Sequence, residues 1–108
     1  MKTISNEQLT IQVSPYGAEL CSILANGKEY LWQADPAFWK RHSPVLFPIV
    51  GSVWENQYRN EGIAYTLSQH GFARDMEFTL VSEKDDEVRY RLVSNEETLQ
   101  KYPFPFCL

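Results

Sequence analysis

The sequence lacks three features that would place it in large functional classes. Its 108 residues contain no apolar run near the roughly 20 residues needed to span a bilayer, so we expect no membrane association. Residues 1–7 contain no long apolar core, so we expect no signal peptide. The one basic cluster is residues 40–42, and the net charge is −4. Without a basic stripe to meet phosphates, nucleic acid is not an expected partner.

Cysteine and histidine are also scarce. The two cysteines, Cys21 and Cys107, lie far apart, and we interpret them as free thiols in a reducing compartment, which predicts a cytoplasmic protein. The two histidines, His42 and His70, are distant from each other, and no Cys or His pair has the spacing of metal ligands. We therefore expect no metal site.

Aromatic residues are plentiful, at 14%, which favours a packed β-rich domain, and the length allows one small core. Seven runs of alternating or β-branched and aromatic residues are separated by turn signals, of which Asn26-Gly27 is the strongest because both residues tolerate positive φ. The predicted strands cover residues 9–13, 18–24, 28–32, 54–59, 63–67, 78–82 and 88–93. The sequence therefore predicts a set of antiparallel strands.

Three segments interrupt the strands. Asp35 followed by Pro36 predicts a capped helical turn. Residues 43–51 are apolar but carry two prolines, so we expect an extended, buried connection in place of a regular central strand. Ser94 with Glu97 three residues later fits a capping box, which predicts a short helix that ends before Pro103.

The stretch most typical of a functional site is residues 67–75, between two predicted strands. It brings His70, Gly71 and Arg74 within five positions, and Gly71 permits a turn that could direct the imidazole and the guanidinium towards one small polar ligand. On local grounds alone, a solvated turn histidine and an Arg74–Asp75 surface ion pair are the simpler explanation of the stretch. The remaining evidence lies elsewhere in the chain.

Three motifs in order give that evidence: residues 43–51 (SPVLFPIVG), residues 70–74 (HGFAR) and residues 102–106 (YPFPF). Together with residues 15–20 and 30–32, they resemble the aldose 1-epimerase (galactose mutarotase-like) family, above all its LacX-type bacterial branch. The resemblance implies an all-β fold, an antiparallel β-sandwich of the galactose mutarotase-like supersandwich type. Residues 1–108 would form its N-terminal portion, a partial sandwich with one or two short helical turns.

The implied reaction is the interconversion of the α and β anomers of an aldose or phosphosugar, without a cofactor. It needs a base that removes the proton of the anomeric hydroxyl and an acid that protonates the ring oxygen. His70 matches the family's first active-site histidine, which hydrogen-bonds the sugar near its ring oxygen, so the resemblance implies a catalytic and substrate-binding role for it. Arg74 belongs to the same motif and is expected to bind a sugar hydroxyl or a phosphate.

The sequence departs from the family pattern at two places. Ser52 stands where the branch commonly has a sugar-binding arginine. The family's second histidine, its general acid, and its glutamate base lie beyond the segment matched by residues 102–106. We therefore expect a truncated member that is weak or inactive alone, and exposed sheet edges that favour self-association.

Two other functions stay open from the residues. A non-catalytic carbohydrate-binding β domain could stack sugars on aromatic side chains, although packing in the core is the simpler explanation for them. The aromatic residues concerned are Trp32, Trp39, Trp54 and Tyr58. A structural or interaction β domain without a ligand is the third possibility.

Overall fold

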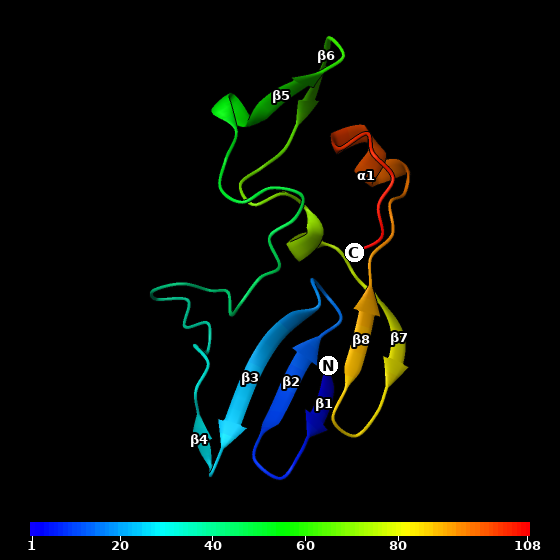
Figure 1. Cartoon of the computed structure of the whole chain (residues 1–108). Helices are drawn as coiled ribbons and strands as arrows, with labels where there is room; N and C mark the ends of the chain where they lie inside the picture. Colours follow the sequence, from blue (N-terminus) through cyan, green and yellow to red (C-terminus); the bar gives the residue numbers. More distant parts are fainter.

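The computed structural model describes residues 1–108, which form three antiparallel sheets (Figure 1). The largest has four strands in the order β1-β2-β3-β4, and two further hairpins are β5-β6 and β7-β8. The strands are β1 (Lys2–Ser5), β2 (Thr10–Ser14), β3 (Glu19–Ala25), β4 (Lys28–Glu29), β5 (Gln57–Asn60), β6 (Ile63–Thr66), β7 (Thr79–Glu83) and β8 (Val88–Arg91). One short helix, α1 (Glu96–Lys101), and two 3-10 turns, η1 (Trp54–Asn56) and η2 (Ala73–Asp75), complete the chain. The predicted all-β class with short helical turns is confirmed.

The predicted hairpins form, with two corrections at the first sheet. Asn26 and Gly27 have φ of 50° and 74°, as the β3–β4 turn requires. The sequence reading missed β1, because residues 1–7 show no clear alternation. It also made β4 too long. The Tyr30 amide still donates to the Ile23 carbonyl (2.8 Å), but the amides of Ile23 (2.8 Å) and Leu31 (3.0 Å) donate to the Glu29 carboxylate, so the regular pairing between backbones ends there.

The predicted helix forms, but its cap is one residue later than expected. Asn95, not Ser94, accepts the amide hydrogen bond of Thr98 (2.9 Å), and the Thr98 hydroxyl accepts from the Asn95 amide (2.9 Å). The Ser94 hydroxyl accepts instead from the amide of Phe106 (3.1 Å). The wrong prediction arose because threonine at the third helical position can close the box as glutamate does.

The two irregular segments before β5 differ in part from the predictions. Asp35 accepts amide hydrogen bonds from Ala37, Phe38 and Trp39, which makes a single turn and no assigned helix. Residues 43–51 are an irregular connection without a strand, as their prolines predicted. They are only half-buried, however, and Val50 is 77% exposed. The prediction of a buried connection is therefore wrong for part of the segment.

Hydrogen bonds between residues far apart in the sequence position the hairpins relative to the rest of the chain. The Ser5 amide donates to the Asp85 carbonyl (2.9 Å), so β1 lies beside the β7–β8 hairpin (Figure 1). At the other end, the Tyr58 hydroxyl donates to the Lys101 carbonyl (2.6 Å), which fastens the β5–β6 hairpin to α1. None of the helical elements is long and apolar enough to cross a lipid bilayer.

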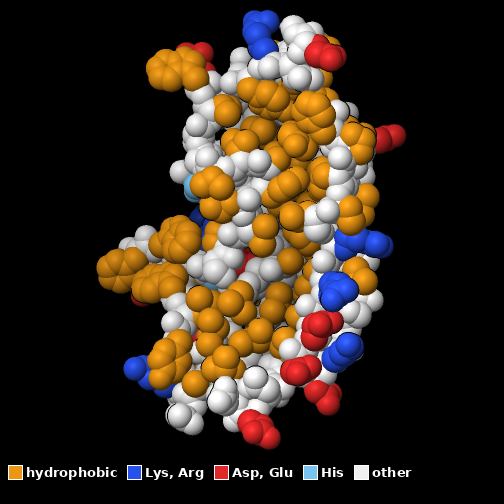
Figure 2. Space-filling view, in the orientation of Figure 1, with side chains coloured by type: hydrophobic (Ala, Val, Ile, Leu, Met, Phe, Trp, Pro, Cys, Tyr) orange, Lys and Arg blue, Asp and Glu red, His pale blue; other side chains and the backbone are white.

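The core is small for a chain of this length. Only 12 of 108 residues are buried, and the central cluster consists of Ala73, Phe78 and Leu92. The molecule measures 54 × 34 × 15 Å, and its radius of gyration is 16.3 Å, against about 13 Å for a compact domain of this size. Figure 2 shows apolar side chains spread over the face in view. Within this chain, no second layer covers that face.

Candidate functional site

The candidate site is built where two loops, residues 46–51 and 68–75, run side by side. Phe47 and Gly71 form a parallel bridge, and the Phe47 carbonyl accepts hydrogen bonds from the amides of Phe72 (3.0 Å) and Ala73 (3.2 Å). Gly71 has φ of +72°, and a Cβ at this position would overlap the Phe47 carbonyl. A glycine is therefore required for both its backbone conformation and its lack of a side chain.

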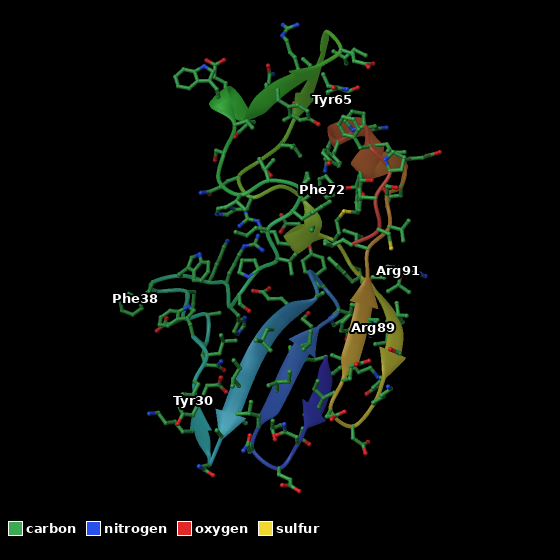
Figure 3. The ribbon with its side chains drawn as sticks, in the orientation of Figure 1. Tyr30, Phe38, Tyr65, Phe72, Arg89 and Arg91 are labelled. Atoms are coloured by element: carbon green, nitrogen blue, oxygen red, sulfur yellow. The ribbon has the colours of Figure 1, made fainter.

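An aromatic cluster explains why the three motifs of the sequence come together. The Phe47 ring, from residues 43–51, lies 6.2 Å from that of Phe72 and 4.8 Å from that of Phe106, between ring centroids. The Tyr102 ring lies 6.1 Å from that of Phe47 and 6.3 Å from that of Phe106. Figure 3 places Phe72 at the middle of the molecule, between the β5–β6 hairpin and the large sheet. The cluster gives the loop that carries His70 an apolar support.

His70 occupies a strained turn position. Its φ is +64°, which a residue with a Cβ adopts at a cost of about 1–3 kcal/mol and keeps only where surrounding contacts hold it. Its amide donates to the Gly51 carbonyl (2.7 Å), and the Gly51 amide donates to Nδ1 of its ring (2.8 Å). The side chain is half-buried. A freely solvated turn histidine, the local alternative from the sequence, does not describe this ring.

Arg74 lies four residues further on, in η2. Its side chain is 16% exposed, and Nη2 donates to the Gln69 carbonyl (2.9 Å). Nε is buried without a hydrogen-bond partner and stands 3.9 Å from the Asp75 carboxylate, too far for a hydrogen bond. The short partner of Asp75 is Arg41, at 2.8 Å. The expected Arg74–Asp75 pair is therefore loose, and one carboxylate serves two arginines.

The turn between β2 and β3 contacts the backbone of η2 and of the residue that follows it. A Cβ on Gly17 would stand 2.8 Å from the Arg74 carbonyl oxygen, and the Gly17 amide donates to the Met76 carbonyl (2.7 Å). The backbone of η2 is thus held from the large sheet as well as from residues 46–51. These contacts therefore determine the position of the Arg74 Cα atom.

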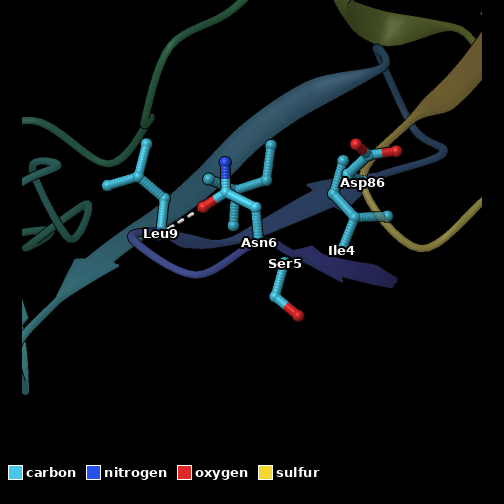
Figure 4. Close-up of a pocket in the computed structure, with 6 residues that line it drawn as sticks. Ile4, Ser5, Asn6, Leu9 and Asp86 are labelled. Carbon is cyan, nitrogen blue, oxygen red and sulfur yellow. Dashed lines mark hydrogen bonds between the residues drawn. The ribbon is translucent and has the colours of Figure 1, made fainter.

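Neither His70 nor Arg74 lines a hollow of this chain. The chain has five hollows, none of which includes either residue. The hollow in Figure 4, of about 200 Å³, is at the β1–β2 turn, at the opposite end of β2 from η2. It is lined by Ile4, Ser5, Asn6, Leu9, Ile11 and Asp86. The two site residues share a loop, but this chain alone does not enclose a ligand beside them.

The tryptophans do not pack in a core of this chain, so the simpler interpretation of them is wrong here. Trp32, Trp39 and Trp54 are 42%, 51% and 86% exposed. The Trp32 indole donates to the Trp39 carbonyl (2.8 Å) and meets the Phe38 ring edge-on, at 6.2 Å between centroids. Phe38 is at the tip of this protruding turn in Figure 3. Tyr58, in contrast, is half-buried and stacks on Tyr65.

The sequence did not indicate that Gly51 contacts His70. The prediction took it as the end of the proline-rich connection, whereas the structure makes it the partner of the His70 ring and backbone. Ser52, where the resemblance leads one to expect arginine, directly follows it and is exposed. No group of three or more His, Cys, Asp or Glu side chains is arranged to hold a metal ion.

Comparisons with known proteins agree on one family. A profile of the aldose 1-epimerase family matches residues 1–108. The plasmid-encoded protein LacX of Lactococcus lactis subsp. lactis is 40% identical over 111 residues, which cover 97% of this chain and 37% of that protein. This chain therefore spans a little over a third of the length of the curated relative.

Solved structures give the same result in three dimensions. A galactose mutarotase related enzyme from Lactobacillus acidophilus superposes with a TM-score of 0.96 at 41% identity, over 98% of this chain and 36% of that one. A galactose mutarotase-like protein from Lactobacillus casei also gives 0.96 at 41% identity, over 100% of this chain and 37% of that one. The fold described above is thus also present within solved chains nearly three times as long.

Proposed function

The chain belongs to the aldose 1-epimerase family, and from that premise we propose that it forms part of the sugar-binding side of an aldose 1-epimerase-like protein. Its ligand is an aldose or a phosphosugar whose α and β anomers the complete site interconverts. The observation that carries the proposal is the His70 ring, which backbone contacts hold in a strained turn at the family motif. Strain of this kind persists where the surrounding structure over-determines it, and such places are frequently functional.

His70 is the proposed catalytic and sugar-contacting residue, close to the ring oxygen of the bound sugar. Arg74 is the second proposed contact, to a hydroxyl or to a phosphate. Its buried and unpartnered Nε, together with the sharing of Asp75 with Arg41, supports an arginine whose donors are not all used within the chain. A bidentate guanidinium suits a phosphate or a pair of hydroxyls.

The chain alone is proposed to be weak or inactive in epimerisation. Mutarotation needs an acid and a base, and each contributes roughly 10²–10⁴-fold of rate. Of the two histidines, only His70 lies in the candidate site, and no hollow encloses it. This chain spans 37% of its LacX relative, which fits a segment that holds only part of the catalytic groups. The free thiols of Cys21 and Cys107 support a cytoplasmic location.

The chain has one histidine in the candidate site, His70, and one outside it, His42, which serves as the control in a test of the proposal. The chain is titrated with galactose, glucose and their 6-phosphates, and the side-chain resonances of both histidines are followed by NMR. We expect the His70 signal, identified by its absence from the His70→Ala spectrum, to shift with at least one sugar, and to shift in the same way in the His42→Ala variant. An absence of any His70 shift at saturating sugar contradicts the proposal.

Polarimetry on freshly dissolved sugar separates epimerase from binding domain. We expect a rate close to that of buffer for the chain alone. Catalysis that survives His70→Ala would remove the proposed role of His70. Binding at the exposed aromatic turn without a His70 shift would favour the non-catalytic carbohydrate-binding alternative, and the Phe38→Ala variant identifies it, since Phe38 is 81% exposed.

A further inference from the structure

The Gly51–His70 contact determines more than the position of the ring. Two hydrogen bonds run in opposite directions between the same two residues: the His70 amide donates to the Gly51 carbonyl (2.7 Å), and the Gly51 amide donates to His70 Nδ1 (2.8 Å). Both residues have positive φ, of 82° and 64°. The pair is thus a closed ring of contacts between two turns that lie 19 residues apart.

The direction of the second bond fixes the chemistry of the imidazole. A neutral imidazole has one nitrogen that donates and one that accepts. An amide N–H can only donate, so Nδ1, which receives it, carries no proton. The proton of the neutral ring is therefore on Nε2. The opposite tautomer would set one N–H against another and leave the Gly51 amide without a partner.

We infer that the Gly51 amide is a positioning group that holds His70 as its Nε2–H tautomer, so that His70 meets a sugar oxygen as a hydrogen-bond donor. The inference rests on the proposed function for its sugar, and it assigns Gly51 a role that the sequence does not suggest. The fixed Nε2–H gives a structural reason for the contact near the sugar ring oxygen that the family resemblance implies for His70.

The surrounding contacts make this pair rigid. The carbonyl of Phe47 holds the amides of Phe72 and Ala73, and Gly71 leaves no room for a Cβ against it. Besides the pair itself, the loop that bears His70 is therefore attached to residues 46–51 through two consecutive amides, those of Phe72 and Ala73. Because both loops are held, the Gly51 amide stays aligned with Nδ1 of His70. The tautomer that accepts this hydrogen bond is therefore favoured throughout.

The first test needs no sugar. Nitrogen-15 NMR of the histidine rings at pH 8.5 distinguishes a pyrrole-type nitrogen, which carries a proton, from a pyridine-type one. We expect pyrrole-type Nε2 and pyridine-type Nδ1 for His70, and tautomer averaging for His42, whose ring makes no hydrogen bond in the structure. His70→Ala assigns the signals. A protonated Nδ1, or averaging equal to that of His42, overturns the inference.

The second test removes only the backbone N–H group of Gly51. An ester in place of the amide between Val50 and Gly51, introduced by total synthesis or by an α-hydroxy acid, deletes the Gly51 donor and keeps φ near +82°. We expect the His70 tautomers to average in this variant. An ester between Glu61 and Gly62, which removes the amide of another glycine with positive φ in the β5–β6 turn, is the matched control and must leave His70 unchanged. A fixed Nε2–H tautomer in the Gly51 ester overturns the inference.

The third test adds sugar and separates the two proposals. The His70→Gln side chain can place an N–H near the position of Nε2, whereas His70→Asn can reach only the position of Nδ1. We expect Gln to retain part of the affinity and Asn to lose it. A fixed tautomer with no sugar effect removes the proposed function and leaves the tautomer assignment standing. Sugar binding that Asn retains and Gln loses overturns the donor role.

Discussion

The Cα of Gly71 lies against the carbonyl group of Phe47, so closely that a Cβ at position 71 would overlap both the carbonyl and the Pro48 ring. This contact joins the loop of residues 68–75 to the proline-rich connection of residues 43–51. It sets the distance between His70 and its partner Gly51, since both loops continue from this point.

Gly71→Ala is therefore expected to destabilise the fold by roughly 2–5 kcal/mol, from positive φ and from overlap together. Gly62→Ala is the control, because Gly62 has the same sign of φ (+78°) but open space around it, and it should lose only the conformational part, about 1–2 kcal/mol. Urea unfolding measures both. Equal losses would show that the contact with Phe47 carries no energy.

The carboxylate of Glu29 is expected to make the β3–β4 hairpin sensitive to acid. The Ser22 hydroxyl (2.6 Å) and the amides of Ile23 and Leu31 donate to it, and these hydrogen bonds hold the pKa of Glu29 below its ordinary value of 4.5. The stabilisation is complete above pH 4.5 and disappears as the pH falls through the lower value of the folded state.

Glu29→Gln should flatten this part of the pH dependence. The urea midpoint of the wild type is compared with that of the variant between pH 7 and pH 3, with Glu77→Gln as the control, because the Glu77 carboxylate makes no hydrogen bond or ion pair. We expect the urea midpoint of the wild type to exceed that of Glu29→Gln at pH 7, and this difference to narrow below pH 4.5. A difference of constant size would mean that the carboxylate charge is not what holds the hairpin.

Arg74→Gln should weaken the binding of a phosphosugar more than that of the matching free sugar. Loss of one charged hydrogen-bond donor costs about 1.5–3 kcal/mol, which corresponds to roughly 10–100-fold in affinity. The control is Arg89→Gln on β8, whose side chain is 66% exposed and pairs only with Glu87. Calorimetric titration with glucose and glucose 6-phosphate measures the difference. An equal effect on both ligands would assign Arg74 to a hydroxyl.

Self-association is expected for this chain in isolation. Its sheets lie in a layer 15 Å thick, and β7 pairs with no strand other than β8, so both a face and an edge are available. Sedimentation velocity should show a mass that rises with concentration. Val81→Lys, on the exposed side of β7, should reduce it, and Gln57→Lys, at an already polar strand position, should not. A monomer at every concentration would contradict this expectation.

A chimaera offers the complementary measurement. Residues 1–108 replace the matching part of the Lactobacillus casei protein, to which they superpose with a TM-score of 0.96. If the apolar face is one that the longer relatives cover, the chimaera should be monomeric and should bind less of a dye for apolar surface than the isolated chain does. Dye binding equal to that of the chain would show that the face stays exposed in the longer protein.

Much of the fold could be predicted because its signals are local. The Asn26-Gly27 turn, the alternation in β2 and β8 and the prolines of residues 43–51 act through backbone conformation and side-chain period, which neighbouring residues determine. The errors also have local causes: a threonine replaced glutamate in the helix cap, and the Glu29 side chain ended β4 early.

The sequence by itself determined the antiparallel strands, the turn at Gly71 and, through three ordered motifs, the family. Only the tertiary structure decided that Gly51 holds the His70 ring, that Arg41 takes the Asp75 carboxylate, and that three tryptophans remain exposed. The reason is physical: strand period and turn preference are properties of adjacent residues, whereas a hydrogen bond across 19 positions depends on how two loops pack around Phe47.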